Sequence, residues 1–137
     1  MRLIAALLLA AAPAAAQQSP LTFDAGKALP LASGQWTYFA TVGGSIAAYG
    51  AQIELRCDRV SRTVTVSRPN GVPAALTIAT DSVTRTLPPS GRLLAVDPLL
   101  DAIAFSRGRF IVAGGIGPTV AVPSWPEAAR SIEDCRN

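Results

Sequence analysis

The chain has 137 residues, half of them hydrophobic, with 12 basic and 9 acidic side chains and a formal net charge of +3. So small a net charge offers no electrostatic footprint for nucleic acid, and we expect no nucleic-acid partner. The chain contains no histidine, which excludes Ser-His-Asp and Cys-His catalysis within it.

Residues 1–16 have the layout of a secretory signal peptide. Arg2 precedes an apolar run that starts at Leu3, and small residues up to Ala16 form a cleavage site. The run is interrupted by Pro13 and is much shorter than the roughly 20 residues of a membrane-spanning helix. We expect cleavage after Ala16, no membrane insertion of the mature chain, and a periplasmic or secreted location.

Residues 17–34 show no sustained hydrophobic period and contain two prolines and two glycines. This composition predicts a flexible leader, which tightens near Leu29 to Leu31, in front of a single β-rich domain, residues 35–137. The domain begins with QWTYFATV (35–42), in which Trp36 and Tyr38 share one parity and Phe39 the other, as in a half-buried strand. We expect Phe39 to belong to a second packed face rather than to a binding surface.

The next segments continue as turn-punctuated strands. SIAAYGAQIELRCD (45–58) is predicted as one long strand bent at Gly50, with Tyr49 packed and Cys57 on its inward face. Further strands are predicted at 62–69, 75–80, 82–87 and 92–96, separated by turns at proline, glycine and aspartate. This part of the chain predicts an antiparallel meander or sandwich.

Two helices are predicted in the last third. The first has Asp97 at the N-cap, Pro98 at its first position and Gly108 just past its end, and its apolar composition indicates burial. A hairpin over 109–123 turns at its glycines. The second helix, 124–135, is amphipathic, with Ser124 and Glu127 spaced as a capping box.

The two cysteines, Cys57 and Cys135, form an even pair in a chain that carries an export signal, which indicates one disulfide. Cys57 lies on the inward parity of its strand, and Cys135 lies on the apolar stripe of the last helix. The sequence therefore predicts an α+β domain: a β-rich antiparallel meander or sandwich with a short buried helix and an amphipathic C-terminal helix tied to the sheet by this disulfide.

Ser106, Arg107 and Arg109 are the candidate binding residues. One interpretation is structural: Arg107 complements the C-terminal dipole of the helix, and Gly108 ends it. The alternative is an anion site, since guanidinium groups pair well with carboxylate or phosphate. Other constellations predict no catalytic residue: Asp97 and Asp101 lack a supporting site, and the glycines of 114–117 lack the context of a phosphate loop. We expect no metal and no cofactor, because histidine is missing and the cysteines are paired.

The segments LDAIAFSRGRFIVAGG and VAVPSWPEAARSIEDCR, within 97–136, resemble small secreted alphaproteobacterial proteins and, more distantly, the invasion-associated locus B family of envelope proteins. The resemblance implies a periplasmic, β-rich domain without catalysis, and it carries over no catalytic residue. We therefore expect an exported, non-enzymatic protein that binds a protein or cell-envelope partner or has a structural role. The alternative is an inhibitor of a cell-wall hydrolase such as lysozyme, acting through the loop TDSVTRT (80–86).

Overall fold

The computed structural model describes residues 21–69 and 71–137, and the expected signal peptide, residues 1–16, lies outside them. The described residues form nine strands and three helices. In chain order the elements are α1 (Phe23–Gly26), β1 (Trp36–Thr41), β2 (Gly44–Tyr49), β3 (Ile53–Asp58), β4 (Thr63–Ser67), β5 (Leu76–Ala79), β6 (Thr84–Leu87), β7 (Arg92–Leu94), α2 (Pro98–Phe105), β8 (Arg109–Gly114), β9 (Val120–Pro123) and α3 (Pro126–Asp134).

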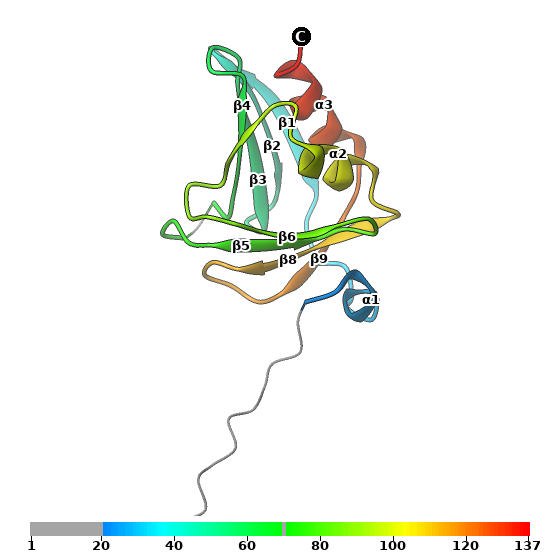
Figure 1. The fold of residues 1–137 in the computed structure, drawn as a ribbon. Helices are drawn as coiled ribbons and strands as arrows, with labels where there is room; N and C mark the ends of the chain where they lie inside the picture. The colour runs from blue at the N-terminus through cyan, green and yellow to red at the C-terminus, as the bar shows by residue number, and fades with distance from the viewer. Residues whose placement is uncertain (1–20, 70) are drawn as a thin grey trace, which may run out of the picture.

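The strands form two antiparallel sheets. The first has the order β1-β2-β3-β4-β7 and the second β6-β5-β8-β9. Figure 1 shows the second sheet running across one end of the first, with α2 and α3 on the side that the two sheets leave open. The β-rich α+β fold predicted from the sequence is confirmed. In the first sheet consecutive strands pair as far as β4. β5 and β6 then pair with each other in the second sheet, and β7 returns to the first sheet to pair with β4.

The core lies between the sheets and beneath the two longer helices. Ile53, Leu55 and Cys57 on β3 alternate inward and are buried, as predicted. Phe110 and Val112 on β8 belong to the same buried cluster from the second sheet. Each large apolar side chain buried in this way stabilises the fold by roughly 1.5–3 kcal/mol relative to exposure.

Residues 45–58 form a hairpin, so the prediction of a single bent strand was wrong. Gly50 has a φ of +51°, and the N–H of Gln52 donates to the carbonyl of Tyr49 at 3.0 Å. A left-handed glycine reverses the chain here, although the apolar alternation on both sides looks continuous in sequence. Tyr49 is buried, as predicted, whereas Phe39 is 51% exposed and does not belong to a second packed face.

α2 begins where the sequence predicts and ends earlier. The carboxylate of Asp97 accepts the backbone N–H two residues later at 2.9 Å, and Pro98 occupies the first turn. The helix ends at Phe105, because Ser106 is extended with a ψ of 137°, so Arg107 does not lie in the last turn. The helix buries three side chains against the core: Leu99, Leu100 and Ile103.

The predicted disulfide is confirmed. Cys57 on β3 is bonded to Cys135, the residue that follows α3, with the two α-carbons 5.6 Å apart and a sequence separation of 78. Ala128 and Ile132 are buried on the side of α3 that faces the sheet. The C-terminal helix is thus held to the first sheet by both packing and a covalent bond.

The capping box predicted at the start of α3 was wrong. Trp125 is the N-cap and makes no side-chain cap hydrogen bond, and Pro126 opens the helix. This start places Ser124 before the cap and Glu127 in the first turn, so the two residues do not occupy the N-cap and N3 positions that a capping box requires. Ser124 Oγ and Glu127 Oε2 are buried without a hydrogen-bond partner among the described residues.

Residues 21–34, the described part of the expected leader, pack against the second sheet. The N–H of Ala32 donates to the carbonyl of Ala121 at 2.8 Å, and Leu31 forms a parallel bridge with Ala121. Leu21, Phe23 and Leu29 contact a small buried cluster on β5, β8 and β9. These residues therefore extend the folded domain beyond the boundary at 34 that the sequence predicts. Among the described residues, no helix has the length and apolar character needed to cross a membrane.

Candidate functional site

The Ser106 hydroxyl is buried and joins three segments of the chain. It donates to the carbonyl of Arg109 at 2.6 Å and accepts the N–H of Asp81 at 3.1 Å. These bonds tie the end of α2 to the start of β8 and to the β5–β6 turn. Its donor and one acceptor position are occupied within the fold, which leaves the hydroxyl a structural role.

Arg109 and Arg107, the other predicted binding residues, have different environments. Arg109 Nη1 donates to the carbonyls of Leu29 at 2.7 Å and Lys27 at 3.4 Å, so this guanidinium holds residues 21–34 against the sheet. The Arg107 side chain is 92% exposed and lies 3.6 Å from a carboxylate oxygen of Asp81.

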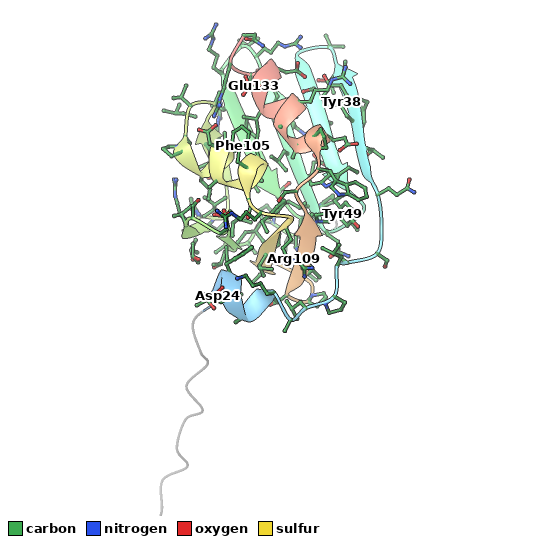
Figure 2. All side chains as sticks on the ribbon, turned by 90° about the vertical axis from the view of Figure 1, so that its right-hand side faces the viewer. Asp24, Tyr38, Tyr49, Phe105, Arg109 and Glu133 are labelled. Atoms are coloured by element: carbon green, nitrogen blue, oxygen red, sulfur yellow. A yellow bond between two sulfur atoms is a disulfide. The ribbon has the colours of Figure 1, made fainter. Side chains whose placement is uncertain are left out.

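Arg107 and Arg109 line a surface hollow of about 510 Å³, together with Phe23, Asp24, Lys27, Asp81 and Ser82. Carboxylates of the protein itself pair with two of the cations in this hollow. Lys27 pairs with Asp24 at 2.8 Å, and Arg107 lies near Asp81. Figure 2 shows Arg109, at the start of β8, and Asp24, on α1, toward the same end of the molecule. This hollow is a weaker candidate for anion binding than the sequence alone indicated.

A buried arginine that sequence analysis missed lies next to a second hollow. Arg68, just after β4, is only 7% exposed. Its Nε donates to Gln52, its Nη1 to Gly114 and its Nη2 to Pro118, all backbone carbonyls, at 3.2, 2.9 and 2.6 Å. Burial lowers the pKa of the guanidinium, yet arginine stays charged in proteins. The side chain joins the β2–β3 turn to the β8–β9 loop and thereby clamps the two sheets together.

The β8–β9 loop is shaped to admit this side chain. Gly117 has a φ of +144°, and a β-carbon there would lie 2.9 Å from Arg68 Nη1. A β-carbon on Gly115 would lie 3.3 Å from Arg68 Cδ. The glycine-rich turn predicted at 114–117 therefore has a packing role, and no local pattern in the sequence indicated its contact with Arg68.

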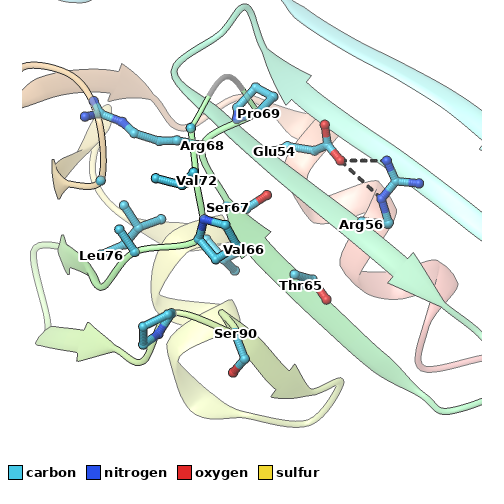
Figure 3. Close-up of a pocket in the computed structure, with 15 residues that line it drawn as sticks. Glu54, Arg56, Thr65, Val66, Ser67, Arg68, Pro69, Val72, Leu76 and Ser90 are labelled. Atoms are coloured by element: carbon cyan, nitrogen blue, oxygen red, sulfur yellow. Dashed lines mark hydrogen bonds and ion pairs between the residues drawn. The ribbon is translucent and has the colours of Figure 1, made fainter.

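A groove of about 400 Å³ lies beside Arg68, on the face of the first sheet opposite the core (Figure 3). Its floor consists of alternate residues of β3 and β4, and its walls are the segment after β4 and the turn before β7. The lining residues that present hydrogen-bonding side chains on the floor and rim are Glu54, Arg56, Thr65, Ser67 and Ser90. The apolar lining residues include Pro69, Val72, Pro73, Leu76 and Pro89.

The polar groups of the groove have unused hydrogen-bonding capacity. Arg56 donates through Nε and Nη2 to the same oxygen of Glu54, at 3.2 and 3.0 Å (Figure 3). Glu54 Oε2 and Arg56 Nη1 have no partner among the described residues, and the same holds for the hydroxyls of Thr65, Ser67 and Ser90. The groove therefore offers donors and acceptors side by side, next to apolar surface, and sequence analysis named none of its residues as candidates.

The loop at 80–86, through which a hydrolase inhibitor was expected to act, is a tight turn between β5 and β6. Thr80 Oγ1 accepts the N–H groups of Ser82 and Val83, at 3.3 and 3.0 Å. Asp81 is the only carboxylate in 80–86, and Arg107 lies near it. The tip thus presents no cluster of free negative charge for a basic cleft.

No family model, curated protein or solved structure matches this chain.

Proposed function

We propose that this chain is an exported, non-enzymatic binding protein of the cell envelope, and that the groove of Figure 3 holds an extended polypeptide segment of a partner protein. The observation that carries the proposal is the set of hydrogen-bonding side chains that line the groove without a partner in the described part of the chain, beside apolar walls. Binding sites commonly combine apolar surface with a few well-placed polar groups.

The absence of catalytic chemistry in the sequence supports a binding role. The chain has no histidine, its only lysine is Lys27, and both cysteines are in the disulfide. Ser67 and Ser90 in the groove therefore have no histidine, thiolate or neighbouring lysine to activate them. Glu54, the cross-strand neighbour of Ser67, is engaged by Arg56.

Export is supported by two independent features. Residues 1–16 have the layout of a signal peptide. The Cys57–Cys135 bond is of the kind that persists in oxidising compartments such as the periplasm.

A polypeptide fits the groove better than a glycan. Sugar rings stack their apolar faces on aromatic side chains, and none of the described groove residues is aromatic. An extended peptide presents alternating N–H and C=O groups, which hydroxyls can satisfy because each both donates and accepts. Its side chains would lie against Val72, Leu76 and the prolines.

The proposal is tested by site-specific photocrosslinking. The full chain is expressed in its native host with p-benzoylphenylalanine in place of Val72, which is an exposed groove residue. Export is checked by fractionation and by thiol labelling before and after reduction. We expect a crosslinked polypeptide adduct from the periplasmic fraction and two thiols that react only after reduction.

The matched control places the same photocrosslinker at Val60, which is exposed on the β3–β4 turn away from the groove. A second variant, Ser67→Arg, fills the groove and should abolish the adduct at position 72 without changing the thermal midpoint by more than a few degrees. The proposal is wrong if positions 72 and 60 give the same adducts, if the adduct survives Ser67→Arg, or if it is glycan rather than protein.

A further inference from the structure

The free edge of the first sheet, formed by β1, differs from the other sheet edges. β1 consists of six residues, WTYFAT, with no charge and no proline. It pairs with β2 on one side, and its other side has no backbone partner among the described residues. An uncharged edge of this length is a template for pairing with another strand.

The remaining edges are blocked by devices that proteins commonly use for that purpose. β7 has only three residues. β6 carries Arg85 at its centre, in an ion pair with Asp97, and Pro88 follows the strand. β9 is covered by the bridge from Leu31 to Ala121. Among the described residues, β1 is thus the edge left open for pairing.

We propose that β1 pairs antiparallel with β1 of a second copy of this chain, joining the two first sheets across a two-fold axis. The chemistry of the edge favours a self-complementary partner, since a two-fold interface presents the same patch from both sides. The strand itself is uncharged. The α3 surface next to it carries both signs: Arg130 lies over the Tyr38 ring at 3.9 Å, and the Tyr38 hydroxyl donates to Asp134. Figure 2 shows Tyr38 beside α3.

The register of the pair follows from the hairpin. β1 and β2 are joined by a two-residue turn, so Thr41 and Gly44 form a hydrogen-bonded pair and the pairs alternate from there. The backbone groups of Tyr38 and Ala40 then point away from β2 and are free to pair. A two-fold axis at Phe39 pairs Tyr38 with Ala40 of the other copy and sets the two Phe39 rings opposite each other.

Phe39 is the side chain that this register would bury. It is 51% exposed, while its cross-strand neighbour Ile46 is nearly covered. Facing residues of a non-hydrogen-bonded pair lie about 4.5 Å apart at Cα, and aromatic pairs at such sites are favourable. The second copy would therefore cover the exposed Phe39 ring and also form hydrogen bonds with the backbone groups of the β1 edge.

The test uses the purified full chain with its disulfide intact. Sedimentation equilibrium over a range from low to high micromolar concentration should show a monomer–dimer equilibrium. Phe39→Lys, which sets two like charges opposite each other, should weaken dimerisation at least tenfold. Val60→Lys adds the same charge on an exposed turn and should leave dimerisation unchanged. A wild-type chain that stays monomeric, or a dimer unaffected by Phe39→Lys, overturns the proposal.

A crosslink tests the register. Phe39→Cys should form an intermolecular disulfide under mild oxidation, because facing residues at the axis lie within bonding reach. Thr41→Cys places the thiol two residues from the axis, opposite Thr37 of the other copy, and should not crosslink. Crosslinking at 41 but not at 39, or at neither position, overturns the proposed register.

Discussion

Replacing Arg68 tests whether a buried guanidinium that donates to three backbone carbonyls holds the two sheets together. Arg68→Met keeps most of the apolar stem and removes all three hydrogen bonds. Hydrogen bonds to charged groups contribute roughly 1.5–3 kcal/mol each, and carbonyls left unpaired in a buried site add a desolvation cost. The contributions of the three bonds are not additive, and methionine avoids the cost of burying a charge. We therefore expect the free energy of unfolding to fall by about 3–5 kcal/mol.

The measurement is urea unfolding at neutral pH, followed by tryptophan fluorescence and by far-UV circular dichroism. The matched control is Arg56→Met on β3, because Arg56 is exposed and, within the described residues, its side chain bonds only to Glu54. Loss of such a surface pair should cost less than about 1 kcal/mol. Arg68→Lys keeps the charge but cannot reach three diverging carbonyls from one ammonium group, so its stability should fall between the wild type and Arg68→Met.

A double-mutant cycle with Gly117→Ala separates the clamp from general destabilisation. The new methyl group would press on Arg68 Nη1, and the φ of +144° adds backbone strain. The steric part disappears when Arg68 is methionine, so the double variant should be more stable than the sum of the single changes predicts. A loss below 1 kcal/mol for Arg68→Met, or strict additivity in the cycle, would refute the clamp.

Three further predictions concern other parts of the fold. Reducing the Cys57–Cys135 bond, or replacing both residues by alanine, should cost about 4.5 kcal/mol in the chain-entropy model for a separation of 78, and an unchanged urea midpoint would contradict this. Ser106→Ala unpairs two backbone groups and should cost about 1–3 kcal/mol by urea unfolding; a loss below 0.5 kcal/mol would mean that the hydroxyl is not structural. Burial acts to raise the pKa of Asp134, but the Tyr38 hydroxyl and nearby arginines lower it overall below 3.8. Its contribution is therefore present above about pH 4 and lost as the pH falls further. Asp134→Asn should flatten the acid limb of stability against pH, and an unchanged limb would contradict the assignment.

The sequence predicted the elements whose signals are local. Alternation in IELRC placed Cys57 inward, and the helical stripe placed Cys135 on the same side, so the disulfide and the docking of α3 followed from two periodicities. Asp97 and Pro98 marked the start of α2 because capping depends on adjacent residues. Each of these patterns can be read from a segment no longer than one strand or a few helical turns.

Two local features and several that depend on long-range contacts escaped prediction. The hairpin at Gly50 was missed because apolar alternation continues on both sides of the turn. The capping box at Ser124 failed because Pro126 moved the helix start by one residue. No local signal in the sequence indicates that β5 and β6 leave the first sheet and join the second. The burial of Arg68 has no local signal either, because its three hydrogen-bond partners come from distant segments.

The same long-range contacts connect stability to the proposed binding groove. Arg68 anchors the beginning of the segment that forms one wall of the groove, and Val72 and Leu76 follow it along that wall. Holding the wall against both sheets reduces the conformational entropy lost when a ligand binds, which is the effect of preorganisation. A variant with a loosened clamp should therefore lose peptide binding even under conditions where it remains folded, whereas Arg56→Met should alter only the polar contacts of the floor. The clamp explains why a groove lined by a loop rich in proline and glycine can have a defined shape.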